Sequence, residues 1–150
     1  MAAQRVAETA RDAMYARDRA ARALGIAVEE IGPGFARCKM TVRDDMLNGH
    51  GTCHGGLIFT LADTAFAYAC NSYDRATVAL GAQITFTTPA QGGDGLIATA
   101  SERSRSGRTG VYDVEVSRAD GTLLALFRGN AYETRGTAVC VGVADREPGT

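Results

Sequence analysis

One carboxylate of this chain lies where an acidic residue is not expected. Residues 57–70 form a largely apolar run, and Asp63 is its single charged member. The run presents apolar residues on every side of a helix, which is typical of a helix enclosed by the rest of a domain. Burial of an unpaired carboxylate costs free energy and raises its pKa. Asp63 is therefore either a catalytic group or a structural carboxylate satisfied by backbone donors or an arginine.

A polar, glycine-rich loop precedes this run at 48–54. A helix that begins near Gly55 has unpaired N–H groups there, and Gly55 and Gly56 allow a ligand to approach them closely. Such donors hold a phosphate or the oxyanion that develops when a carbonyl is attacked. Asp63 lies about 12 Å further along the helix, at about 1.5 Å per residue. One helix does not bring its carboxylate to its own donors, whereas two antiparallel copies do, so the spacing favours a dimeric active site.

Three other chemistries fit the loop less well. Cys53 and His54 suggest a cysteine nucleophile with a histidine base, but adjacent residues rarely point at each other and no third orienting group is evident. His50, Cys53 and His54 match no standard zinc spacing and lack a fourth ligand. The glycines form neither a dinucleotide fingerprint nor a phosphate-binding loop, since neither GxGxxG nor a following Gly-Lys-Ser/Thr is present.

Length, charge and composition limit the classes of protein to which this chain can belong. The chain has 150 residues, enough for one domain with a core, and a formal net charge of −1, so no basic field favours nucleic acid or an anionic membrane. The apolar run is too short and interrupted to span a membrane. The first residues lack the apolar segment of a signal peptide. Cys38, Cys53, Cys70 and Cys140 show no paired spacing and are interpreted as reduced thiols, so we expect a cytoplasmic protein.

The hydrophobic pattern predicts one α+β domain. Helical spacing indicates an amphipathic helix over 3–24 and a buried central helix over about 55–72. Alternation predicts strands at 26–31, 35–43, 76–88, 96–105, 111–118 and 122–133. Short turns join the last four strands, so we expect an antiparallel meander and one sheet wrapped around the central helix. The domain is predicted to cover 1–135, followed by a flexible tail at 136–150.

Several nearly continuous motifs carry a family resemblance. They are MLNGH at 46–50, CHGG at 53–56, LADTAFAYACNS at 61–72, GVYDV at 110–114 and ALFRG at 125–129. On these motifs the chain resembles the hotdog-fold thioesterases of the phenylacetic acid degradation (PaaI) type, over roughly residues 10–133. The resemblance implies the hotdog fold and a homotetramer built as a dimer of dimers, with active sites at the dimer interfaces.

The resemblance also implies an activity and the residues that carry it. The expected reaction is hydrolysis of acyl-coenzyme A thioesters in phenylacetate degradation, with phenylacetyl and hydroxyphenylacetyl as the acyl groups. Asp63 matches the catalytic acid, and Gly55 matches the helix N-terminal donor that polarises the thioester carbonyl. His54 and Asn48 match the polar loop residues beside it. No metal or prosthetic group is implied, and coenzyme A enters only as part of the substrate.

The roles within this set stay open. Asp63 can attack the thioester carbonyl to form a mixed anhydride, or act as general base for water. His54 is interpreted as orienting the site, with helix capping as the plainer alternative. Asn48 is either a turn residue, given the Asn-Gly dipeptide, or a group that holds water or the acyl carbonyl. Some relatives place a serine or threonine near the start of the strand that follows the central helix. This chain has Ala79 and Leu80 in that region, so that role is not assigned to a residue.

Basic residues concentrate near strand ends, at Arg103, Arg105, Arg108 and Arg128. They are either a solvated rim or contacts for the phosphates of coenzyme A, which arginine's planar fork suits. Arg108 and Arg128 are the better candidates. Thr109, Gly110 and Gly56 complete the predicted coenzyme A contacts as hydrogen-bonding and close-approach positions.

Three alternatives compete with arylacetyl-CoA hydrolysis. Medium-chain or benzoyl thioesters fit the same site, because fold does not determine substrate. Hydration of an enoyl thioester requires a histidine–aspartate pair placed for proton abstraction. A non-catalytic acyl-CoA binding module has no use for a carboxylate at Asp63.

Overall fold

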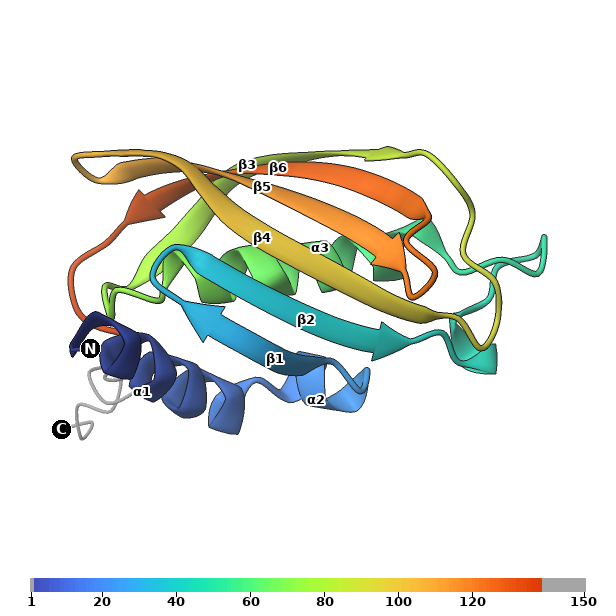
Figure 1. The fold of residues 1–150 in the computed structure, drawn as a ribbon, viewed down its shortest axis with the longest axis horizontal. Helices are drawn as coiled ribbons and strands as arrows, with labels where there is room; N and C mark the ends of the chain where they lie inside the picture. Colours follow the sequence, from blue (N-terminus) through green and yellow to red (C-terminus); the bar gives the residue numbers. More distant parts are fainter. Residues whose placement is uncertain (1, 139–150) are drawn as a thin grey trace, which may run out of the picture.

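A six-stranded antiparallel sheet wraps around one long helix in this protein (Figure 1). The computed structural model describes residues 2–138. Its elements, in chain order, are α1 (Ala2–Arg17), α2 (Arg19–Ala23), β1 (Ala27–Gly32), β2 (Phe35–Thr41), the short 3-10 helix η1 (Asp44–Met46), α3 (Gly55–Cys70), β3 (Thr77–Phe86), β4 (Gly95–Ser106), β5 (Thr109–Arg118) and β6 (Leu123–Glu133). The α+β hotdog prediction and the central helix are confirmed, with α3 ending two residues earlier than expected.

The core lies between α3 and the concave face of the sheet. Alternate residues of β2, β4, β5 and β6 turn toward the helix and are buried, as a period of two requires. Aromatic rings fill the centre: Phe66 packs edge-on against Tyr112 at a centroid distance of 5.6 Å and lies 5.8 Å from Phe127. Gly129 of β6 makes room for this cluster, because a Cβ there would lie 2.8 Å from the Phe66 ring. Close packing holds α3 in place against the sheet.

The strand order corrects the predicted meander. The sheet runs β1-β2-β4-β5-β6-β3, so of the last four strands only β4, β5 and β6 pair in sequence. β3 crosses to the far edge and pairs with β6, while β4 pairs with β2. Alternation identifies a strand and its buried face but does not specify its neighbours, which is why four consecutive strands were wrongly expected to be adjacent.

Strand β3 is exposed on both of its faces. It forms the free edge beyond β6, and Val78, Leu80 and Phe86 are 49%, 65% and 49% exposed. The register with β6 shifts between Ala79 and Gly81, which leaves Leu80 in a β-bulge. An edge strand with exposed apolar side chains is a surface that another chain can cover.

The N-terminal helix is broken, where one helix over 3–24 was predicted. Asp18 leaves the helical conformation and caps α2, its carboxylate accepting the N–H of Ala21 at 3.1 Å. The same carboxylate accepts the hydroxyl of Tyr68 in α3 at 3.1 Å. This tertiary contact, which the sequence did not indicate, favours a cap over continuation of the helix.

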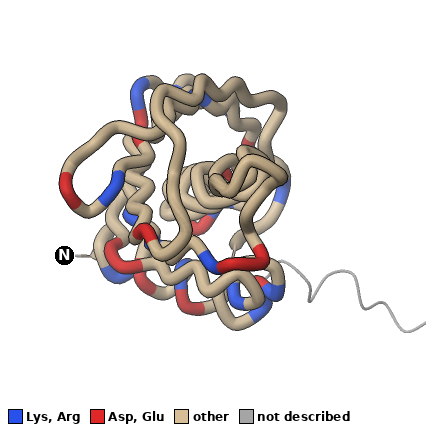
Figure 2. Tube along the Cα trace, turned by 90° about the vertical axis from the view of Figure 1, so that its right-hand side faces the viewer, with Lys and Arg blue, Asp and Glu red and all other residues tan. Residues whose placement is uncertain are grey.

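Charged residues of both signs are interspersed around the periphery when the molecule is viewed along α3 (Figure 2). Among the helices of residues 2–138, none has the length and apolar character needed to cross a membrane. Most of the predicted tail, at 139–150, lies outside the described residues. Its flexibility and the domain boundary at 135 stay predictions.

Candidate active site

Asp63 lies on the one open stripe of α3. Beyond its first turn the helix is buried except at Phe59, Thr60, Asp63 and Ala67, and the last three follow each other at helical spacing. The carboxylate makes no hydrogen bond or ion pair with residues 2–138, and burial raises its pKa above the ordinary value for aspartate. The structural alternative required a partner for this carboxylate, and the described part of the chain provides none.

The N-terminus of α3 presents an unused donor. His54 caps the helix, its Nδ1 accepting the Gly56 N–H at 3.3 Å and its carbonyl accepting the Leu57 N–H at 3.0 Å. The N–H of Gly55 has no acceptor among the described residues, as expected at the first helical position. The ring of Phe86 lies against Gly55, where an added Cβ would come within 3.0 Å of it. Gly55 therefore combines an open N–H with an apolar wall.

His54 and Asn48 have structural tasks in this loop. With Nδ1 accepting from Gly56, the proton of the neutral His54 ring is on the exposed Nε2, which can donate outward. Asn48 Oδ1 accepts the N–H groups of His50 at 2.9 Å and Thr52 at 3.2 Å. The Asn48 side chain closes the loop that leads into α3, and the His54 side chain caps the helix.

Cys53 does not form a nucleophile pair with its neighbour. It is buried, its thiol contacts the carbonyl of His54 rather than the ring, and burial raises its pKa. A thiol with a raised pKa is a poor nucleophile at neutral pH. Among residues 2–138, no group of three or more histidine, cysteine or acidic side chains is placed to hold a metal ion.

The described chain does not bring its two reactive features together. Gly55 and Asp63 belong to the same straight element, about 12 Å apart along its axis at about 1.5 Å per residue. Both are half-buried rather than enclosed by the sheet. A thioester whose oxygen accepts a hydrogen bond from the Gly55 N–H is therefore too far from Asp63 of the same helix. It reaches an Asp63 carboxylate only if a second copy of the chain provides that carboxylate.

Comparison with known proteins identifies the family of this site. The model of the Thioesterase superfamily matches residues 50–125, from the loop before α3 into β6. The chain is 50% identical over 125 residues to acyl-coenzyme A thioesterase PaaI of Escherichia coli K12, which covers 83% of this chain and 89% of that protein. The chain belongs to the thioesterase superfamily. Within it the protein is a thioesterase of the PaaI type, as the motifs predicted.

Solved structures agree with this assignment. The E. coli PaaI protein from the phenylacetic acid degradation operon superposes with a TM-score of 0.88 at 48% identity, covering 89% of this chain and 97% of that one. A mutant of the phenylacetic acid degradation protein PaaI from Thermus thermophilus gives a TM-score of 0.73 at 40% identity, covering 76% of this chain and 97% of that one. The similarity therefore extends over 89% of this chain in the first comparison and 76% in the second.

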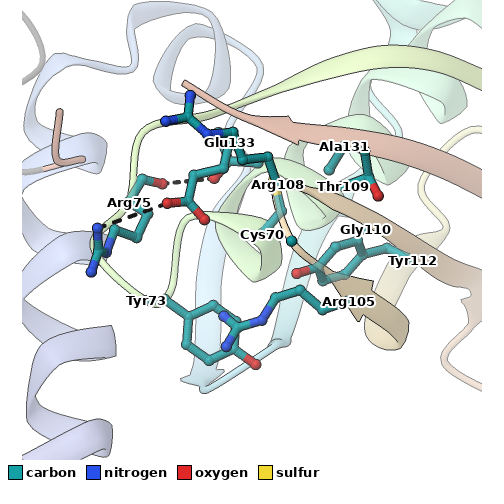
Figure 3. A pocket seen from close by; sticks show the side chains of 12 residues that line it. Cys70, Tyr73, Arg75, Arg105, Arg108, Thr109, Gly110, Tyr112, Ala131 and Glu133 are labelled. Atoms are coloured by element: carbon teal, nitrogen blue, oxygen red, sulfur yellow. Dashed lines mark hydrogen bonds and ion pairs between the residues drawn. The ribbon is translucent and has the colours of Figure 1, made fainter. Parts of the chain in front are cut away.

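The two arginines predicted to contact coenzyme A are separated in this thioesterase. Arg128 lies on the outer face of the sheet and forms a bidentate pair with Asp113, with Nε–Oδ1 and Nη2–Oδ2 distances of 2.6 and 2.9 Å. Arg108, Thr109 and Gly110 instead line a pocket at the end of α3 (Figure 3). Successive residues of a strand point to opposite faces, so Arg128 lies away from α3 and its fork is occupied.

Sequence reasoning missed part of this pocket. Tyr73, Arg75 and Glu133 also line it, and Arg105 contributes its guanidinium to the rim. Only Arg105 and Arg108 belonged to a basic run that the sequence showed. Arg75 lies in the turn between α3 and β3, and Glu133 ends β6, so only the strand crossing brings them together.

Proposed function

We propose that this thioesterase hydrolyses acyl-coenzyme A thioesters, with phenylacetyl and hydroxyphenylacetyl groups as the preferred acyl class. The observation that carries the proposal is Asp63, an unpaired carboxylate of raised pKa on the open stripe of a buried helix. The names of the E. coli and T. thermophilus relatives, which refer to acyl-coenzyme A and to phenylacetic acid degradation, support the acyl class. The free thiols of Cys38, Cys53 and Cys70 agree with the cytoplasm as its location.

The active site is completed by a second copy of the chain. The separation of Gly55 from Asp63 supports this, because an antiparallel pair of α3 helices places each Asp63 near the other copy's Gly55 N–H. The open stripe of α3 and the exposed edge strand β3 are the surfaces available for the contact, and Val78, Leu80 and Phe86 are the exposed apolar residues of β3. Two such dimers make the homotetramer.

The chemistry follows from these two groups. The Gly55 N–H of one subunit donates to the thioester oxygen, where negative charge grows as the carbonyl is attacked. In the nucleophilic route, Asp63 of the other subunit bonds to the acyl carbon, the carbon–sulfur bond breaks, and coenzyme A leaves as the thiolate. Water then hydrolyses the mixed anhydride to the free acid and restores Asp63. In the general-base route, Asp63 takes a proton from the water that attacks directly.

The remaining predicted residues position these groups. His54 caps α3 through Nδ1 and holds the Gly55 N–H in its direction, while Asn48 holds the loop. Gly56 lets the substrate approach the helix end. Arg108, Thr109 and Gly110 contact the phosphates of coenzyme A at the pocket rim. Enoyl hydration is not favoured, because the Gly56 N–H occupies the lone pair of His54 Nδ1 that a proton-abstracting base needs.

The test is thioester hydrolysis by the purified protein, followed by release of free thiol. The panel contains phenylacetyl-, 3- and 4-hydroxyphenylacetyl-, benzoyl- and medium-chain acyl-CoA, with Asp63→Asn as the variant and Asp113→Asn as the matched control. We expect a preference for the arylacetyl members that only Asp63→Asn abolishes. Equal rates for Asp63→Asn and the wild type would refute the role of Asp63. A rapid-quench burst of thiol ahead of the acid would indicate the anhydride route.

A further inference from the structure

The loop that leads into α3 is attached to a turn from another part of the chain. The loop comprises residues 47–54, and the turn, residues 90–94, lies in the connection from β3 to β4 beside it (Figure 1). The Cys53 N–H donates to the carbonyl of Ala90 at 2.8 Å, and Thr52 forms an antiparallel bridge with Gln91. Cys53 lies two residues before Gly55, so a displacement of the turn also displaces the first residue of α3.

The turn is held in its shape by Asp94. The Asp94 carboxylate accepts the N–H of Gln91 at 2.7 Å through Oδ2, and the Asp94 N–H donates to the Gln91 carbonyl at 3.1 Å. The Asp94 carbonyl accepts the Val42 N–H at 2.9 Å, and the Val42 carbonyl accepts the Gly93 N–H at 2.8 Å. Hydrogen bonds from an aspartate to nearby backbone groups stabilise turns. Asp94 therefore fixes both the turn and its attachment to the chain just after β2.

Arg118, at the end of β5, supports this carboxylate from a distant part of the sequence. Its Nη1 donates to Asp94 Oδ2 at 3.2 Å, and only 23% and 21% of the two side chains are exposed. Its Nε is buried, lies 3.7 Å from Asp120 and has no hydrogen-bond partner within residues 2–138. A buried donor without an acceptor costs free energy and calls for an explanation. The contact of the same guanidinium with Asp94 provides one.

The proposed reaction depends on the direction of the Gly55 N–H. Loss of one donor to an oxyanion lowers kcat by about 10²- to 10³-fold, and a misplacement of about 1 Å can cost about 10²-fold. The loop before Gly55 contains Gly49 and Gly51, residues that restrict the backbone least. The direction of the donor therefore depends on support from outside the loop.

We propose that Asp94 and Arg118 are positioning residues for the Gly55 N–H. Asp94 holds the turn at 90–94 against the loop, and Arg118 holds the Asp94 carboxylate in the orientation that this contact requires. The inference rests on the proposed function, in which the Gly55 N–H polarises the thioester carbonyl. It gives a role in turnover to an ion pair that lies outside the reacting groups.

The test is steady-state kinetics with the thioester that the wild type hydrolyses fastest. Asp94→Asn should lower kcat about tenfold and leave KM within about twofold, because a misdirected donor weakens transition-state stabilisation while the substrate contacts remain. Arg118→Met keeps the apolar stem and removes the charged group, so kcat should fall about three- to fivefold. Arg118→Lys restores the charge and should recover most of the lost kcat.

Arg37→Met is the matched control. Arg37 Nη1 donates to Glu30 at 2.7 Å across β1 and β2, in a pair that does not contact the loop or the turn. This variant should keep the wild-type kcat. A loss of kcat in Arg37→Met as large as that in Arg118→Met would overturn the inference, because any ion pair of the sheet would then have the same effect.

The carbonyl stretching frequency of the bound thioester reports the donor directly, since a hydrogen bond to the carbonyl oxygen lowers that frequency. It is measured on Asp63→Asn, in which slow turnover keeps the substrate intact. Adding Asp94→Asn or Arg118→Met should reduce the lowering, and adding Arg37→Met should not. Unchanged frequency and unchanged kcat in both Asp94→Asn and Arg118→Met would overturn the inference, as would a rise in KM without a loss of kcat.

Amide hydrogen exchange separates this inference from the proposed function, because it requires no substrate. The Cys53 N–H, which is bonded to Ala90, should exchange faster in Asp94→Asn and Arg118→Met than in the wild type and in Arg37→Met. That result supports the coupling of the ion pair to the loop even if no thioester is hydrolysed. Unchanged exchange in both variants would overturn the inference whatever the activity, and melting temperatures show that the compared variants are folded.

Discussion

Asp63 and Asp113 are two carboxylates of one domain in opposite environments. Asp63 lies on α3 inside the curve of the sheet, without a partner among the described residues, and burial raises its pKa. Asp113 lies on the outer face of β5, where the bidentate hydrogen bonds of Arg128 lower its pKa and the charge of Arg103 lowers it further. The oxygens of Asp113 already accept hydrogen bonds, so this carboxylate is not available to a substrate. The oxygens of Asp63 accept none within residues 2–138, so this carboxylate is available to act as a nucleophile or a base.

The arginines repeat this contrast. Arg128 donates two short hydrogen bonds to Asp113, whereas the guanidinium groups of Arg75, Arg105 and Arg108 donate none within residues 2–138. On the outer face of the sheet, the guanidinium of Arg128 is therefore already occupied by Asp113. The end of α3 has charges that remain available to a ligand, and this is the difference that the following predictions test.

The largest expected effect is that of Asp63→Asn. Loss of the carboxylate should reduce kcat by about 10²- to 10⁴-fold, because the amide neither attacks a carbonyl nor accepts a proton. Substrate binding should survive, since the amide is nearly isosteric. Asp113→Asn should stay within about twofold of the wild-type rate, as no reacting group depends on it. Steady-state kinetics and calorimetric binding of the substrate check both variants, and a comparable loss in the two would remove the distinction between the faces.

The second prediction concerns pH. The reacting form of Asp63 is the carboxylate, and its folded pKa is raised, so kcat/KM should fall about tenfold per pH unit below a midpoint that lies above the usual aspartate value. Stability responds to Asp113 in the opposite sense. Its folded pKa is lowered, so its contribution is complete above the unfolded value of about 3.9 and is lost as pH falls through the folded pKa. A pH–rate profile with the midpoint of an ordinary aspartate would contradict the first part.

The third prediction compares adjacent residues of β6 on opposite faces. Gly129→Ala places a methyl group 2.8 Å from the Phe66 ring and should destabilise the fold by about 1–3 kcal/mol. Asn130→Ala on the exposed face should change the free energy of unfolding by less than about 0.5 kcal/mol. Denaturant titrations measure both. Equal losses of unfolding free energy in the two variants would mean that the core around Phe66 rearranges to accommodate the added methyl group.

The smallest expected effect is that of Arg128→Ala. An exposed ion pair contributes about 0.2–1 kcal/mol, so the loss of stability should be small and should shrink further as salt is raised. The KM for the coenzyme A thioester should not change. A rise in KM specific to the coenzyme A thioester would return Arg128 to the substrate site, as the sequence first suggested.

Local pattern was enough to predict the parts of this protein that depend on near neighbours in the chain. The apolar run around Asp63 predicted a buried helix, and the alternation of β4, β5 and β6 predicted strands within two residues of their observed ends. The same run showed that Asp63 is a carboxylate in an apolar environment, where burial without a partner costs free energy. The motifs at 53–56 and 61–72 carried the family, which the comparisons confirmed. The candidate roles of Gly55, His54 and Asn48 could be assigned by their positions in these motifs.

What depends on distant segments was decided only by the tertiary structure. The period of a strand marks its two faces but not its partners, so the crossing of β3 to the far edge and the outward direction of Arg128 could not be predicted. The break at Asp18 required Tyr68, fifty residues away. The pocket at the C-terminal end of α3 joins the turn after α3 to β4 and β6 in the same way. Residues near each other in the chain determine periodicity. The contacts between distant segments instead follow from the long-range packing that gives the whole chain its lowest free energy.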